Sequence, residues 1–160
     1  MVVTSRRRII IDTDPGHDDA FALLLAIASP QELEVLGITT VAGNVPLEKT
    51  TYNALRLREL AGSSEVPVFR GCERPLVNRL VTAEYVHGES GLDGPDLPPP
   101  TGGVEAKHAV DYLVDTLRSS PDPLTVCLLG PMTNMATITG ASHFDGPIFT
   151  AFLSLFSGGV

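Results

Sequence analysis

The chain has 160 residues, 43% of them hydrophobic, and its formal net charge is −8 at pH 7. This length and apolar content fit a single domain with one sizeable core. The acidic balance argues against nucleic-acid and membrane-surface partners. No apolar run is long enough for a transmembrane helix, and residues 1–8 lack the apolar segment of a signal peptide. We therefore expect a cytoplasmic protein whose two cysteines, Cys72 and Cys127, form no disulfide.

Apolar runs typical of strands alternate along the chain with segments of helical period. We predict strands over 9–13, 33–41, 66–69 and 124–129. Helices are predicted over 18–28, 46–61 and 108–117, and another begins near Thr133. The first helix is apolar on nearly all sides, so we expect it to be buried.

This alternation predicts an α/β fold: a Rossmann-like, mostly parallel sheet with helices on both faces. Cys127, inside the last strand-like run, is expected to be buried. Residues 72–103 show no periodicity, and a loop of that length in a compact domain usually has a function. In sheets of this type, ligands bind at the carboxyl ends of the strands.

The end of the chain has an unusual pattern. Residues 148–156 are apolar, and a glycine pair follows them, which normally leads into more structure. We therefore expect a truncated chain, with residues 1–160 forming a single partial domain. Such a chain would expose apolar surface at its C-terminal end and would self-associate or form a homo-oligomer.

An acidic cluster follows the first predicted strand. Asp12, Asp14, Asp18 and Asp19 lie within eight residues, and Pro15-Gly16 between them is turn chemistry. Like charges this close are unfavourable unless a cation, protons or ligand donors offset them. Carboxylate oxygens suit Ca²⁺ or Mg²⁺. The cluster therefore predicts a metal site at the carboxyl end of a strand.

Two other interpretations of this cluster are open. Asp18 or Asp19 could simply cap the following helix. A haloacid-dehalogenase-type phosphatase would also place Asp-x-Asp after its first strand, with Asp12 as nucleophile, Asp14 as acid/base and Thr40 as a later strand-end residue. That chemistry requires neither Pro15-Gly16 nor the second pair of aspartates.

Four motifs together point to one family. They are DTDPGHDDA at residues 12–20, TTVAGN at 39–44, HGESG at 87–91 and GPMTN at 130–134. In this order they resemble the N-terminal half of the inosine-uridine preferring nucleoside hydrolases, over roughly residues 6–136. The resemblance implies Ca²⁺-dependent hydrolysis of the N-glycosidic bond of ribonucleosides, giving ribose and free base.

The resemblance also implies individual roles. Asp14 and Asp19 would be Ca²⁺ ligands together with the carbonyl oxygen of Leu129, and Asp14 would also be the general base. Asp18 and Asn44 would hold ribose hydroxyls. His87 would lie near the base, unless it is an ordinary surface-loop histidine.

Two further residues follow from the same motif. Asp12 would orient the other carboxylates, whereas His17 fills a variable position and is expected to have no particular role.

Family members are about twice this length, and their second half supplies groups that do not occur here. These are a Gly-Asn…Glu-Phe-Asn ribose segment and a His-Asp pair that provides the leaving-group acid and the last Ca²⁺ carboxylate. From about residue 137 the sequence diverges from the family. We therefore expect slow hydrolysis or none from this chain alone. A non-catalytic truncated paralogue that keeps a cation site is an open alternative.

Overall fold

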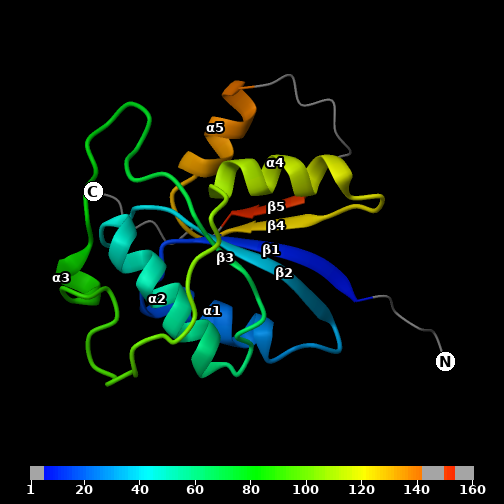
Figure 1. The fold of residues 1–160 in the computed structure, drawn as a ribbon. Coiled ribbons are helices and arrows are strands. Elements are labelled where there is room, and N and C mark those ends of the chain that lie inside the picture. Colours follow the sequence, from blue (N-terminus) through cyan, green and yellow to red (C-terminus); the bar gives the residue numbers. More distant parts are fainter. Residues whose placement is uncertain (1–5, 142–149, 154–160) are drawn as a thin grey trace.

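The computed structural model describes residues 6–141 and 150–153. Five strands form one parallel sheet in the order β3-β2-β1-β4-β5 (Figure 1). The strands are β1 (Arg7–Thr13), β2 (Leu33–Thr40), β3 (Val68–Arg70), β4 (Thr125–Leu128) and β5 (Thr150–Leu153). Because β1 is central and its neighbours run parallel to it, the ends of β1, β2 and β4 meet at one edge. The predicted α/β fold with a parallel sheet is confirmed.

Helices cover both faces of this sheet (Figure 1). On one face lie α1 (His17–Ile27) and α2 (Leu47–Leu60), and on the other lie α4 (Ala109–Ser119) and α5 (Thr133–Ala141). Each face has its own apolar core. Ile9 and Ile11 of β1 belong to the core beneath α1 and α2, whereas Ile10 belongs to the core beneath α4 and α5. This alternation along one strand is why its apolar run is continuous.

Two burial predictions were wrong. In α1, Phe21 and Leu25 are 78% and 70% exposed, whereas Leu23 and Ala26 face the core. A helix outside a sheet buries only one side, whatever the composition of the other. Cys127 is half-buried because it packs at the margin of the core under α1 and α2. Both cysteines, Cys72 and Cys127, are free.

The non-periodic stretch 72–103 contains one short helix, α3 (Glu84–His87). The main chain ties this stretch to the end of β2: Ala42 N–H donates to the Cys72 carbonyl at 3.0 Å, and Ala83 N–H donates to the Asn44 carbonyl at 2.8 Å. These bonds hold the long loop at the edge of the sheet where the strands end.

The apolar run 148–156 lies largely outside the described residues; within it the structure describes the strand β5. The apolar surface expected at the C-terminal end therefore stays a prediction. Among the described residues, no helix is both long and apolar enough to cross a membrane.

Candidate active site

A cleft of about 860 Å³ opens at the carboxyl ends of β1, β2 and β4. All six residues that the sequence analysis proposed for a site line it: Asp14, Asp18, Asp19, Asn44, His87 and Leu129. Leu129 directly follows β4, and its main-chain N–H donates to the Asp12 carbonyl at 2.8 Å. The structure thus brings together residues that come from four separate segments of the chain.

Asp14 lines the cleft and is only 5% exposed. Its Oδ2 accepts the main-chain N–H of Asn44 at 2.7 Å, and its carbonyl accepts the Asn44 side-chain amide at 3.0 Å. Burial and the neighbouring charge of Asp19 raise the pKa of Asp14 to about 8. A carboxyl group in this setting at neutral pH calls for a proton or a cation.

Glycines leave the space that the Asp14 carboxylate fills. A Cβ atom at Gly43 would lie 2.0 Å from Asp14 Oδ2, and one at Gly130 would lie 2.4 Å from Asp14 Oδ1. Both distances are far shorter than any van der Waals contact. The Asp14 carboxylate therefore packs closely between the loops that follow β2 and β4.

Asp19 serves two purposes. Its Oδ2 accepts the Gly16 N–H at 3.1 Å, so it caps α1, as one of the alternative interpretations proposed. Its Oδ1 accepts the Thr13 hydroxyl at 2.6 Å, and Asn44 Nδ2 lies 3.3 Å from Oδ2. Burial raises the pKa of Asp19. Capping and a place in the cleft are thus compatible in one side chain.

Asp12 lies behind the cleft and is fully buried. Its Oδ1 accepts the Thr39 hydroxyl at 2.5 Å and the Asn134 amide at 2.7 Å. Its Oδ2 has no hydrogen-bond partner in the described structure, and burial raises its pKa to about 6. The carboxyl group cannot be reached by a substrate, and the Thr40 hydroxyl bonds Thr51 at 2.8 Å. The structure gives the phosphatase alternative no support.

The donor chemistry of the cleft fits a hard divalent cation. The carboxylates of Asp14 and Asp19 line the cleft, as does Leu129, which we predicted to supply a main-chain carbonyl oxygen. The raised pKa of both carboxyl groups and the unpartnered buried Oδ2 of Asp12 are what such a site shows without its counter-charge. In number these ligands are few for Ca²⁺. No group of three or more His, Cys, Asp or Glu side chains within the described residues is arranged to hold a metal.

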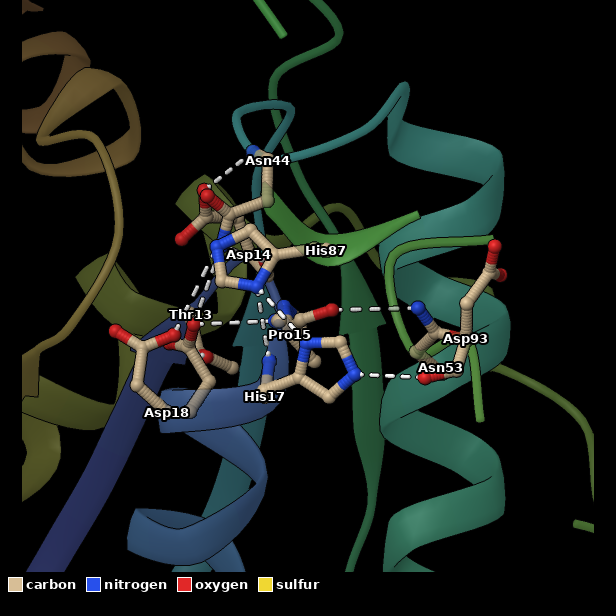
Figure 2. Close-up of polar contacts among 11 residues, drawn as sticks. Thr13, Asp14, Pro15, His17, Asp18, Asn44, Asn53, His87 and Asp93 are labelled. Carbon is tan, nitrogen blue, oxygen red and sulfur yellow. Dashed lines mark hydrogen bonds and ion pairs between the residues drawn. The ribbon is translucent and has the colours of Figure 1, made fainter. Parts of the chain in front are cut away.

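Two histidines flank the cleft (Figure 2). His87, with 12% of its side chain exposed, lies with Nε2 4.0 Å from Oδ1 of the more exposed Asp18. The ring of His17 contacts the ring of His87, with centroids 5.4 Å apart. The structure thus places His17, for which we expected no particular role, beside His87.

Other residues that shape the cleft were not predicted from the sequence. Asn53 of α2 reaches the Pro15 carbonyl, Asp93 organises the loop after His87, and Asn134 of α5 binds Asp12. Each holds main chain or another carboxylate, without itself lining the cleft. Only Asn134 left a signal, since it belongs to one of the four motifs.

Comparison with known proteins supports the family resemblance found in the sequence. The family model for inosine-uridine preferring nucleoside hydrolases matches residues 9–142. An uncharacterized protein of Schizosaccharomyces pombe is 55% identical over 130 residues, which are 81% of this chain and 42% of that protein. The pyrimidine-specific ribonucleoside hydrolase RihA of Photobacterium profundum is 49% identical over 137 residues, 86% of this chain and 44% of that enzyme.

Solved structures have the same fold. A purine-preferring ribonucleoside hydrolase from Gardnerella vaginalis superposes with a TM-score of 0.79 at 31% identity, covering 85% of this chain and 44% of that one. The plant nucleoside hydrolase PpNRh1 gives 0.77 at 37% identity, covering 86% and 44%. The chain thus spans less than half the length of these relatives. The match over residues 9–142 shows that it belongs to the inosine-uridine preferring nucleoside hydrolase family.

Proposed function

We propose that the cleft at the end of β1 takes part in Ca²⁺-dependent hydrolysis of the N-glycosidic bond of ribonucleosides, giving ribose and free base. The observation that carries this proposal is the buried Asp14 carboxyl group, held by Asn44 and raised in pKa beside Asp19. The relatives named as ribonucleoside hydrolases support the substrate class.

Asp14 is the general base of the proposed reaction. Burial raises the pKa of Asp14 in the protein without a cation, and a bound Ca²⁺ would favour the ionised carboxylate, which is the form that can accept a proton. It takes a proton from water while the water oxygen bonds to the anomeric carbon of the ribose. The bond from that carbon to the nucleobase nitrogen breaks, and its electron pair leaves with the nucleobase. The ribosyl group carries positive charge in the transition state, and the acidic cleft stabilises it.

Asp18 and Asn44 are proposed to bind ribose hydroxyls, and His87 to lie toward the base. All three line the cleft. Asp18 has 59% of its side chain exposed, which leaves its carboxylate accessible to a diol. The Asn44 amide nitrogen already bonds the main-chain carbonyl of Asp14 and the carboxylate of Asp19, and the main-chain N–H of Asn44 holds the Asp14 carboxylate.

Ca²⁺ would be held by the carboxylates of Asp14 and Asp19 and by the Leu129 carbonyl. When bound, such a cation lowers the pKa of a coordinated water and orients a diol. Asp12, with Oδ1 bonded to Thr39 and Asn134, keeps a further negative charge behind these ligands.

The test is release of reducing sugar from inosine, uridine and adenosine, with Asp14→Asn as the blank. Because this chain spans less than half of its relatives, we expect slow turnover, best measured with protein in excess over nucleoside. Loss of a leaving-group acid alone typically slows a reaction by roughly 10² to 10⁴.

Three outcomes separate the alternatives. Slow release that disappears in Asp14→Asn supports the proposal. Equal release from both proteins rules out Asp14 as the base. No release even with excess protein, combined with retained Ca²⁺ binding, favours the non-catalytic paralogue.

A further inference from the structure

The side chain of Asn53 lies between two segments that carry residues of the cleft. It belongs to α2 and is 1% exposed. Its Nδ2 donates to the Pro15 carbonyl at 3.2 Å (Figure 2) and to the Ser90 carbonyl at 2.8 Å. An amide NH₂ group has two hydrogens, so one nitrogen can serve both acceptors. One buried side chain thus bonds both the β1–α1 turn and the loop 87–93.

The two carbonyls that Asn53 binds are close in sequence to candidate site residues. Pro15 directly follows Asp14, and Ser90 belongs to the HGESG motif that begins with His87. Both bonds go to the main chain, so they fix the path of each segment rather than the rotamer of one side chain. The placement of Asp14 relative to His87 therefore depends on a residue outside the cleft.

The loop approaches Asn53 closely because Gly91 has no side chain. Gly91 is buried and has a φ of +84°, and a Cβ atom there would lie 3.0 Å from Asn53 Nδ2 and 2.9 Å from Val45 Cγ2. The next residue, Leu92, is 4% exposed and packs in the core beneath α1 and α2. The second glycine of the HGESG motif thus permits the contact with α2.

Asn53 also belongs to a polar stripe on α2. The stripe consists of residues 49, 53, 56 and 59, which lie three or four positions apart and so share one face of the helix. Each bonds main-chain groups of the segment 89–102. The partners are the carbonyls of Glu89, Ser90 and Leu97 and the N–H groups of Thr101 and Gly102. Among the contacts that the structure describes, only Asn53 of this stripe also bonds the β1–α1 turn.

We propose that Asn53 is a positioning residue that couples the β1–α1 turn to the loop 87–93, so that Asp14 and His87 keep their relative positions across the cleft. Without the amide, both carbonyls lose this donor and the two segments move more independently. The consequence for nucleosides rests on the proposed function: a nucleoside that contacts both segments would find them misaligned.

Two pairs of variants test this coupling from opposite sides. Asn53→Leu removes the amide and keeps a side chain of similar shape. Its control, Ala54→Gly, weakens the same helix through its lower helix propensity and changes no side-chain bond to either segment. Gly91→Ala disturbs the contact from the loop. Its control is Gly94→Ala, because Gly94 also has a positive φ, +123°, but nothing lies within 4 Å of its Cβ position.

The readout is amide hydrogen exchange, resolved by residue with NMR, on the full chain with a chelator and without nucleoside. Gly16 N–H, which donates to Asp19 Oδ2, reports on the turn, and Gly91 N–H, which donates to the Gly88 carbonyl, reports on the loop. Asn53→Leu should speed exchange of both roughly fivefold, the factor for about one lost hydrogen bond in each segment. Ala54→Gly should not single out these two amides.

The loop-side pair tests whether a disturbance crosses from one segment to the other. Gly91→Ala should also speed exchange of Gly16 N–H, whereas Gly94→Ala should leave it unchanged. In the double variant with Asn53→Leu, we expect Gly91→Ala to have no further effect on Gly16, because the connection is already lost. An equal effect in both backgrounds would mean that the coupling runs through other contacts, and it would overturn the proposal.

Other outcomes are equally decisive. Unchanged exchange of Gly16 N–H in Asn53→Leu overturns the proposal, and so does a uniform rise in exchange over all amides, since Asn53 would then only stabilise the fold. If Asn53→Leu does not fold, equal exchange of Gly16 in Gly91→Ala and Gly94→Ala contradicts the coupling.

Sugar release adds a readout that general destabilisation would not change in the folded protein. Asn53→Leu should lower kcat more than it raises KM, because a nucleoside can still bind one segment while its alignment with the other is lost. Ala54→Gly should change neither constant. A chain that releases no sugar but shows the expected exchange pattern contradicts the proposed function alone.

Discussion

The main-chain N–H of Asn44 donates a 2.7 Å hydrogen bond to Oδ2 of Asp14, a residue 30 positions earlier in the chain. The bond joins the loop after β2 to the turn after β1. It uses a backbone group, so no substitution of the Asn44 side chain removes it directly. The orientation of Asp14 is therefore set by the path of a neighbouring loop, and that path depends on residues small enough to allow it.

Gly43→Ala should displace Asp14, because the new Cβ would lie 2.0 Å from Asp14 Oδ2. We expect Ca²⁺ affinity to fall roughly 10- to 100-fold, as is usual when the support of a metal ligand is disturbed. Calorimetric titration measures this. Gly103→Ala is the control, since nothing lies within 4 Å of its Cβ position. Equal affinities for the two variants would show that the carboxylate does not need this space.

Ca²⁺ should bind the wild type and not Asp14→Ala, because Asp14 is proposed as a central ligand. We expect weaker binding than at a complete Ca²⁺ site, since ligand charge sets affinity and only two of the carboxylates that line the cleft, those of Asp14 and Asp19, are proposed as ligands. Titration heats give the answer. Asp122→Ala, in an exposed loop, should bind like the wild type. Identical heats for Asp14→Ala and wild type would contradict the assignment.

Stability of the metal-free protein should fall as pH rises. Burial raises the folded-state pKa from the usual 3.8 to about 6 for Asp12 and about 8 for Asp14. Between about pH 4 and 8 the folded state therefore holds more protons than the unfolded chain, so a rise in pH favours unfolding. Asp12 alone should contribute about 3 kcal/mol to this loss.

Urea unfolding in the presence of a chelator, at pH 5 and pH 7.5, measures this dependence. Asp12→Asn and Asp14→Asn should each flatten it, since they remove a titrating group. Added Ca²⁺ should reduce the dependence as well, because a bound cation stabilises ionised carboxylates. Stability that rises with pH in the chelated protein would be the opposite sign and would refute the prediction.

Asn134→Ala should destabilise the fold strongly. The Asn134 amide donates to Asp12 Oδ1 at 2.7 Å and to the Thr40 carbonyl at 3.0 Å, and its oxygen accepts the Cys72 N–H at 2.9 Å. Alanine leaves these buried groups unpaired, which costs roughly 3–5 kcal/mol in total. Urea denaturation tests this, with the exposed Thr139→Ala on the same helix as control. A loss below 1 kcal/mol, on the scale of a typical surface change, would mean that water replaces Asn134.

Self-association should depend on the exposed face of α1. Phe21 and Leu25 are one helical turn apart and 78% and 70% exposed, which makes a contiguous apolar surface. Phe21→Ser with Leu25→Ser should shift the protein toward monomer in sedimentation velocity. Leu60→Ser, a single exposed leucine on α2, should not. A wild type that stays monomeric at high concentration would contradict the prediction.

Much of the fold could be predicted from the sequence because the sheet is parallel. Strands covered on both faces appear as continuous apolar runs, and the predicted strand ending at Thr13 ends there in the structure. The α2 boundaries, Leu47–Leu60, lie one residue inside the prediction, because Pro46 and Gly62 mark both ends. Exposure of Phe21 could not be predicted, since periodicity does not distinguish an apolar outward face from a buried one.

The site residues that could be predicted are those whose side chains have a recognisable chemistry of their own. Residues that only support another group could not be predicted. Four aspartates in eight residues indicate a cation site on charge alone. By contrast, the contact between His17 and His87 joins residues 70 positions apart in the chain. Asn53 lies on α2, and nothing in the sequence of that helix indicates that the Asn53 side chain bonds two separate loops. Such contacts follow from loop geometry, which a local pattern does not encode.

The bond between Asn134 and Asp12 joins residues 122 positions apart, and this separation affects when the site can exist during folding. Closing so long a loop has a large entropic cost, so pairings of this kind form late and slow the folding of parallel sheets. An early intermediate built from local contacts can contain the four aspartates, but it cannot contain Asn134 or the Leu129 carbonyl beside them. A cation that needs the complete set of ligands therefore stabilises the native state without helping the chain reach it. Ca²⁺ is expected to lengthen the lifetime of the folded protein by slowing unfolding, while its refolding rate stays the same.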